Sequence, residues 1–320
     1  MLAGASVLNE SSRKNNAVLA VNMAAANGDP NALFTLAHWR WQGDVMPQDI
    51  GQARELYRKA SEQGHETAGI FYTNLIANGI GGSADWKAAM KRLRDEASRH
   101  PHRKRALSLI RKMSLDPKGD PTSVPTGRTL SDTPQVTLFR RLFSKSECEY
   151  LAHVADPDFK PSFVVDLQTG REERDPVRTS DGAVIHWLIE DPVVHALNRR
   201  LAAISDTAFE QGEPLQILRY RPGQQYLRHR DAIPGYENQR IKTVLVYLNE
   251  GYEGGETCFL HTELRVKGRM GDAIVFRNTL DSGVADPASE HAGLPITVGT
   301  KLLASRWIRQ RAHTPGSAKV

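Results

Sequence analysis

The chain has 320 residues, 40% hydrophobic and 25% charged, which is ordinary for a globular protein with room for two modules. A formal net charge of +5 is too modest to indicate a nucleic-acid-binding protein, and two cysteines do not indicate a disulfide framework. The first ten residues lack a basic start followed by a long apolar run, so we expect no secretory signal, no membrane association and a cytoplasmic protein.

The first third of the chain repeats itself at an interval of 36 residues, from Gly28 to Gly64. Other residues related by this interval are Ala17, Ala53 and Ala89; Ala24 and Ala60; Gly43 and Gly79; and Asp49 and Asp85. A period of this length is typical of stacked helical hairpins. Small residues then lie where helices cross closely, and Gly28 and Gly64 are expected to end helices.

Two stretches within this region, ARELYRKA at 53–60 and EQGH at 62–65, resemble Sel1-like repeats, a family related to tetratricopeptide repeats. The resemblance implies a helical surface for protein–protein contact at 14–113. The alternative is a short array that only extends the structure of the neighbouring module.

Residues 114–131 are rich in proline, glycine and small polar side chains, a composition that predicts a linker. A second domain is expected at 132–312. Within it, the β-branched and aromatic-rich runs at 215–220 and 243–248 are predicted strands that flank His229-Arg-Asp231. Residues i and i+2 of an extended segment project from the same face, so His229 and Asp231 can reach one metal ion.

His291 lies between a loop and the strand-like stretch 295–307, where it can supply a third ligand. Two imidazoles and one carboxylate suit Fe(II) and leave coordination positions open for substrates, although zinc is a rival for this ligand set. Lys301, ten residues further on, offers an ammonium group for the far carboxylate of 2-oxoglutarate. That lysine favours iron with 2-oxoglutarate over zinc-dependent hydrolysis.

A series of motifs in this domain is similar to the prolyl 4-hydroxylase-like Fe(II)/2-oxoglutarate-dependent dioxygenases. The matching segments are RYRPGQQYLRHRD at 219–231, QRIKTVLVYL at 239–248, GGET at 254–257, GDAIVF at 271–276, HAGLP at 291–295 and the stretch 301–309. Residues 142–148 and 177–182 resemble the opening helix of the family and the strand after it. The resemblance implies an α+β multidomain protein in which helical hairpin repeats precede a double-stranded β-helix, or jelly-roll, oxygenase domain.

The resemblance also implies roles for individual residues. His229, Asp231 and His291 match the iron ligands, and Lys301 matches the residue that holds the distal carboxylate of 2-oxoglutarate. The implied reaction consumes 2-oxoglutarate and O2, releases succinate and CO2, uses Fe(II) with ascorbate as an accessory reductant, and hydroxylates a C–H bond as procollagen-proline 4-dioxygenases do. No protein nucleophile is required, and no catalytic residue beyond the metal ligands is expected.

Tyr220 and Thr257 match positions that help the lysine, since a buried carboxylate needs hydrogen-bond donors. A core aromatic and an ordinary strand threonine are the alternative interpretations. Tyr226, Arg240 and Trp307 match positions that contact the peptide in peptidyl-prolyl hydroxylases.

Two alternatives apply to the peptide contacts. Trp307 alternates with charged residues as in a half-exposed strand, so simple packing can explain it, and Arg240 can pair with a nearby acid such as Glu237. The segment between Asp231 and Arg240 is also short, which leaves room for a small substrate.

The leading hypothesis is a hydroxylase of proline within a peptide or protein. A hydroxylase of a free amino acid or small metabolite is the nearest alternative. A non-catalytic interaction scaffold, in which the helical repeats bind a protein partner, belongs to another class. The intact set of metal ligands argues against the non-catalytic scaffold. A third alternative, nucleic-acid demethylation, is suggested only by the net charge.

Overall fold

The computed structural model describes residues 15–165 and 172–315, and these fall into two compact units. The first unit comprises the helices up to Ser108 together with the segment Trp187–Pro192, and the second holds Leu109–His186 and Val193–Thr314. None of the helices in the described ranges is both long and apolar enough to cross a bilayer.

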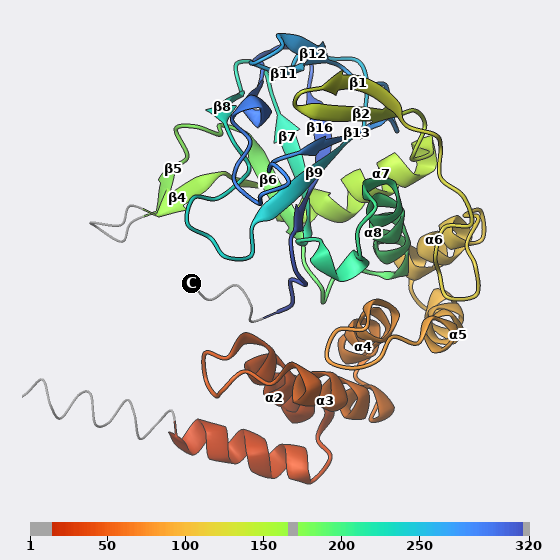
Figure 1. Cartoon of the computed structure of the whole chain (residues 1–320). Helices are drawn as coiled ribbons and strands as arrows, with labels where there is room; N and C mark the ends of the chain where they lie inside the picture. Colours follow the sequence, from red (N-terminus) through yellow and green to blue (C-terminus); the bar gives the residue numbers. More distant parts are fainter. Residues whose placement is uncertain (1–14, 166–171, 316–320) are drawn as a thin grey trace, which may run out of the picture. The chain divides into compact units, whose positions relative to one another are not determined.

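The first unit is built from antiparallel helices, drawn from red to orange in Figure 1. A helix at 15–26 is followed by α2 (Pro30–Gln42), α3 (Ile50–Glu62), α4 (Glu66–Asn78) and α5 (Trp86–Ala97), and α6 (Pro101–Ile110) leads into the second unit. From α2 to α5, consecutive helices pack on one another, because each buries its small and apolar residues against its neighbour.

Equivalent helix ends carry the same caps. The side chains of Asp49 and Asp85 each accept a hydrogen bond from the backbone N–H three residues on, which satisfies a donor that the helix leaves unpaired. Gly43 and Gly79 end α2 and α4 with left-handed φ angles of 77° and 76°. Each donates its N–H to the carbonyl four residues back, a conformation that glycine adopts at low cost.

Gly28 and Gly64 lie just after helices, as predicted, with φ angles of 82° and 89°. The core of the unit gains one side chain from a distant stretch of sequence, since Leu188 packs among the buried residues of the helices. Two amides of α4 fix the backbone around it. Asn74 donates to the Leu188 carbonyl at 2.8 Å and Asn78 to the Trp187 carbonyl at 3.0 Å.

The second unit contains two larger antiparallel sheets. Eight strands follow the order β1-β2-β13-β9-β16-β7-β6-β3, and four follow the order β12-β11-β14-β8. The strands of the larger sheet are β1 (Arg128–Asp132), β2 (Gln135–Phe139), β3 (Lys160–Pro161), β6 (Asp181–Ile185), β7 (Leu215–Tyr220), β9 (Arg240–Tyr247), β13 (Ala273–Arg277) and β16 (Lys301–Arg309). Those of the smaller sheet are β8 (Tyr226–His229), β11 (Thr257–Phe259), β12 (Leu264–Val266) and β14 (His291–Gly293).

Two short strand pairs and two helices complete this unit. β4 (Phe163–Val165) pairs with β5 (Glu172–Arg174), and β10 (Glu253–Gly254) pairs with β15 (Ile296–Val298). The helices are α7 (Lys145–Ala155), which opens with a capping box, and α8 (Pro192–Ser205).

Residues of both larger sheets form one buried cluster, so the two sheets face each other across a shared core. Phe259 from the smaller sheet meets Phe276 from the larger one edge to face, with ring centroids 5.1 Å apart.

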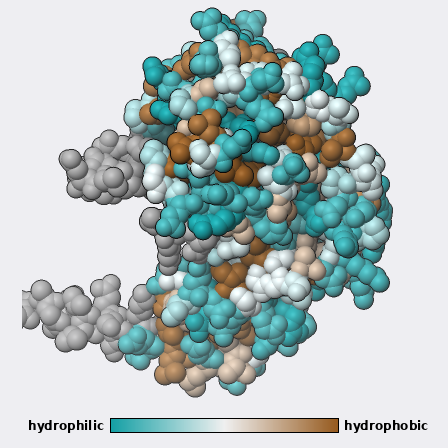
Figure 2. All heavy atoms as spheres, in the orientation of Figure 1, coloured by the Kyte–Doolittle hydropathy of each residue, from teal (hydrophilic) through white to brown (hydrophobic). Residues whose placement is uncertain are grey.

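Hydrophilic side chains predominate on the face drawn in Figure 2, and hydrophobic ones form small patches there. The strand β1 starts at Arg128, inside the stretch predicted as linker, because residues 128–132 pair with β2 across a tight turn.

Candidate metal and co-substrate site

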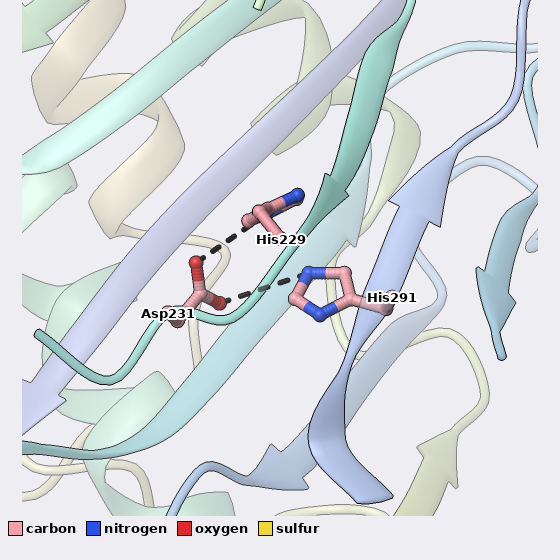
Figure 3. Close-up of side chains that lie close together, drawn as sticks. All are labelled: His229, Asp231 and His291. Atoms are coloured by element: carbon pink, nitrogen blue, oxygen red, sulfur yellow. Dashed lines mark ion pairs between the residues drawn. The ribbon is translucent and has the colours of Figure 1, made fainter. Parts of the chain in front are cut away.

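Adjacent strands of the smaller sheet bring the three predicted metal ligands together. His291 on β14 is the cross-strand partner of His229 on β8, and Asp231 follows two residues after His229. The Nε2 atom of His229 lies 3.6 Å from Oδ1 of Asp231, and Nε2 of His291 lies 3.8 Å from Oδ2 (Figure 3). One ligand atom from each residue lies within 4.8 Å of the others, the spacing that a single bound cation requires.

The hydrogen bonds of the two imidazoles determine which nitrogen is free. Nδ1 of His229 is 2.7 Å from the Leu227 carbonyl, and Nδ1 of His291 is 3.0 Å from the Ser289 carbonyl. A carbonyl only accepts, so each Nδ1 carries the proton and each Nε2 directs a lone pair toward Asp231. Three electron-rich atoms that face one another need a cation between them, so the donor set fits a divalent metal.

The walls of this site are apolar. The ring of Tyr226 stacks on His229 with centroids 3.5 Å apart, and Phe276 contacts the His291 ring edge to face at 4.8 Å. Burial lowers the pKa of His291 to about 4, although the nearby Asp231 opposes the shift. The imidazole is therefore neutral at pH 7, the form that binds a metal.

A single pocket connects this triad with most of the other predicted residues. Its lining includes the triad, Tyr220, Tyr226, Thr257, Lys301 and Trp307, and also Leu218, Leu245, Gly293, Leu303 and Ser305. Strand β16 accounts for much of this wall. Successive side chains of a strand point to opposite faces, so alternate residues from Lys301 to Trp307 face the pocket.

Lys301 is a buried cation at one end of this wall. Its Nζ donates to the Gly255 carbonyl at 2.6 Å and lies 5.6 Å from the ring centroid of Tyr220, its neighbour across the sheet. In the described ranges it forms no ion pair, although the charge of Glu256 favours its protonated form. Burial lowers the pKa of Lys301 to about 8. An unpaired buried ammonium is costly, and an anion bound in the pocket would offset that cost.

Thr257 is buried on β11, and its hydroxyl lies 3.4 Å from the phenol of Tyr247. That phenol also donates to the Val266 carbonyl at 3.1 Å. Tyr247 was not among the site residues predicted from the sequence. The signal that marks it is its place in the 239–248 segment, which contains Arg240 as well.

Arg240 does not line the pocket but supports a residue that does. Its Nε and Nη2 atoms lie 2.6 and 2.9 Å from the carboxylate oxygens of Glu213, and its guanidinium stacks 3.8 Å from the ring centroid of Trp307. The alternative pairing with Glu237 is therefore wrong, because Glu237 instead lies 3.8 Å from Arg311. The sheet brings Glu213 beside Arg240 although 27 residues separate them.

The half-exposed pattern expected around Trp307 is wrong, while burial of the indole agrees with the alternative of packing. β16 lies inside the larger sheet between β9 and β7, and both Trp307 and the preceding Arg306 are buried. The strand is therefore covered on both faces. Within the described residues, the indole Nε1 of Trp307 has no hydrogen-bond partner, which leaves a donor beside the pocket.

A polar pair behind Asp231 was not predicted from the sequence. Thr243 on β9 donates its hydroxyl to Oδ2 of Asp231 at 2.6 Å, and Asn278 donates to Thr243 at 2.9 Å. Neither contact has a local sequence signal, because β9 and the residue after β13 approach Asp231 only in the folded sheet.

Comparison with known proteins agrees with this geometry. The sequence profile of the 2OG-Fe(II) oxygenase superfamily matches residues 215–309. Prolyl 4-hydroxylase 1 of Arabidopsis thaliana is 35% identical over 202 residues, which cover 57% of this chain and 71% of that protein. Probable prolyl 4-hydroxylase 3 of the same plant is 34% identical over 203 residues, covering 56% of this chain and 70% of its own length.

Among solved structures, a viral collagen prolyl hydroxylase from Paramecium Bursaria Chlorella virus-1, in complex with 2OG, matches with a TM-score of 0.44 and 25% identity. The match covers 56% of this chain and 98% of that one. A Pseudomonas putida prolyl-4-hydroxylase matches with a TM-score of 0.41 and 22% identity, covering 55% and 93%. On the sequence relatives, the chain belongs to the prolyl 4-hydroxylase family of Fe(II)- and 2-oxoglutarate-dependent dioxygenases.

Proposed function

We propose that this dioxygenase hydroxylates proline within a peptide or protein. The observation that carries the proposal is one pocket in which the triad of His229, Asp231 and His291 meets the buried, unpaired ammonium of Lys301. A zinc hydrolase does not need an ammonium group at this position. A 2-oxoglutarate site needs a cation there to bind the distal carboxylate of the co-substrate.

His229, Asp231 and His291 are the proposed iron ligands. When bound, Fe(II) supplies the O2 chemistry that converts 2-oxoglutarate to succinate and CO2 and hydroxylates the substrate. The protein holds both imidazoles in the tautomer that exposes Nε2, through the Leu227 and Ser289 carbonyls. The aromatic walls keep bulk water from the metal ligands.

Lys301, Tyr220 and Thr257 are the proposed binding residues for 2-oxoglutarate. Lys301 supplies charge to the distal carboxylate, and the two hydroxyl groups supply further donors from the neighbouring strands. Their burial excludes water that would compete for the same carboxylate oxygens.

Tyr226 and Trp307 are the proposed contacts for the substrate, with Arg240 holding the indole in place. Flat aromatic faces pack well against a proline ring, and the free indole N–H can donate to a backbone carbonyl of the substrate. The relatives are called prolyl 4-hydroxylases, which favours proline over other side chains.

Succinate release and product mass, measured across proline-containing peptides, free proline and other free amino acids, test the proposal. We expect peptides with an oxidised proline and stoichiometric succinate, and a loss of at least about a hundredfold in His229→Ala. Turnover of free amino acids alone would select the small-substrate alternative. Absence of 2-oxoglutarate turnover with every substrate would refute the proposal.

Further proposals concern the rest of the chain. We assign Sel1-like repeats to 14–113, a linker to 114–131, whose last residues belong to β1, and a double-stranded β-helix oxygenase domain to 132–312. The shared caps of α2 and α4, and of α3 and α5, support the repeats, and the two facing sheets support the β-helix. We also propose that the helices bind a protein partner or substrate, and that the enzyme acts in the cytoplasm with ascorbate as accessory reductant.

A further inference from the structure

A chain of two hydrogen bonds leads from the interior of the larger sheet to Asp231. Thr243 on β9 places its Oγ1 2.6 Å from Oδ2 of Asp231, and Asn278, directly after β13, places its Nδ2 2.9 Å from the same Oγ1. All three side chains are buried. Thr243 thus contacts the carboxylate directly, at the oxygen that also faces Nε2 of His291, and Asn278 contacts it through Thr243.

The direction of this chain follows from counting protons. A carboxylate can only accept, so the single hydroxyl proton of Thr243 is committed to Asp231. Oγ1 must then accept from its other neighbour, and the amide nitrogen of Asn278 is a donor. The opposite orientation of the Asn278 amide would place two acceptors against each other.

The amide of Asn278 is not explained by its other contacts. Its Oδ1 is buried and has no hydrogen-bond partner among the residues that the structure describes. A buried acceptor without a partner is destabilising, so an apolar side chain of similar size would pack there at lower cost. The donor that the amide directs at Thr243 accounts for its presence.

We infer that Thr243 and Asn278 are positioning residues that hold Asp231 as a one-oxygen metal ligand. This rests on the proposed metal role of Asp231. The Thr243 bond engages Oδ2, which also lies 3.8 Å from Nε2 of His291, and fixes the plane of the carboxylate, while Oδ1 lies 3.6 Å from Nε2 of His229. A carboxylate bound through both oxygens would take an additional coordination position, and the chelating keto acid and O2 need the open ones.

The test is the affinity of the folded protein for Mn(II), read from the signal of the free ion by electron paramagnetic resonance, with no turnover required. Thr243→Val keeps the shape of the side chain and removes the donor, and we expect it to weaken Mn(II) binding about 10- to 100-fold. Thr243→Ser restores the hydroxyl, and we expect it to restore the affinity.

Asn278→Leu should weaken binding in the same direction. The double variant Thr243→Val, Asn278→Leu should bind no more weakly than Thr243→Val alone, because both changes break one chain. Thr73→Val is the matched control, since it removes a buried threonine hydroxyl in the helical unit. Its Mn(II) affinity should equal that of the wild type.

Folded Thr243→Val, verified by circular dichroism, with wild-type Mn(II) affinity would overturn the inference. If that variant does not fold, wild-type affinity in Asn278→Leu or Asn278→Ala overturns it instead. Failure of the unmodified chain to bind Mn(II) at all would contradict the proposed metal site itself, an outcome distinct from a failure of the two positioning residues.

Discussion

At the scale of single residues, Lys301 places a positive charge in the buried wall of the pocket. Burial takes its ammonium out of water, and among the described residues its hydrogen bond goes to a neutral carbonyl, that of Gly255. The pKa of Lys301 falls from its usual value near 10.5 to about 8. The residue is thus charged at neutral pH and titrates within the range where the enzyme can be assayed.

This shift predicts how 2-oxoglutarate binding depends on pH. The ammonium is present below pH 8 and is lost as the pH rises through 8, so kcat/KM for 2-oxoglutarate should fall above pH 8. At pH 9 about one molecule in ten keeps the proton, and the expected fall is about tenfold relative to pH 7. Steady-state kinetics with 2-oxoglutarate as the varied substrate measures it.

Lys301→Arg is the control for this profile, because a guanidinium stays protonated throughout the range. Its kcat/KM is expected to be lower overall but flat between pH 7 and 9. An alkaline fall of the same size in Lys301→Arg would assign the titration to another group.

At the scale of elements, a buried charge cluster joins the approach to β7 with β9 and β16. Glu213 accepts hydrogen bonds from Arg240 and forms an ion pair with Arg309, whose Nε lies 2.6 Å from Oε1, and both guanidiniums are mostly buried. Glu213→Gln would leave two cations beside each other without a counter-ion. We expect the free energy of unfolding to drop by about 3 to 5 kcal/mol, measured by urea denaturation.

The exposed pair in the same region is the control for this cluster. Glu237 is almost fully exposed and lies 3.8 Å from Arg311, so Glu237→Gln should leave the unfolding curve unchanged. Equal stability losses in both variants would show that the Glu213 cluster contributes no more than a surface pair.

The helix ends give a second prediction at this scale. A Cβ at Gly64 would meet no atom within 4 Å, so Gly64→Ala should cost only the left-handed φ, about 1 kcal/mol. A Cβ at Gly43 would lie 2.9 Å from Cβ of Gln48, so Gly43→Ala should cost more. Thermal unfolding followed by helical circular dichroism compares the two. Equal losses would mean that the turn after α2 relaxes around the new methyl group.

The strands also show which parts of the site can be predicted from the sequence alone. His229 and Asp231 are two residues apart on an extended segment, so local geometry is enough to bring them together. Thr243 and Arg240 depend on which strands become neighbours, and the contacts of each follow from the register of β9 in the sheet. For that reason the nearby Glu237 was the wrong partner for Arg240, and Glu213 was missed.

At the scale of the whole molecule, the two compact units are not two consecutive stretches of the sequence. The segment Trp187–Pro192 lies between β6 and α8 in sequence, yet it belongs to the first unit with the helices. Leu188 is buried in the core of that unit, and amides of α4 bind the backbone at 187 and 188. The helical unit is therefore completed by a stretch of sequence from within the oxygenase region.

Leu188→Ala should consequently destabilise the helical unit although it lies more than 75 residues beyond that unit's last helix. Removal of a buried leucine typically costs about 2 to 5 kcal/mol, because the lost contacts leave a cavity. Hydrogen–deuterium exchange of the amides in α3 and α4 should increase accordingly. Leu19→Ala, at a 60% exposed position of the first helix, should leave that exchange unchanged. Wild-type protection of α3 and α4 in Leu188→Ala would show instead that the helices fold without this segment, and that the array is an independent module.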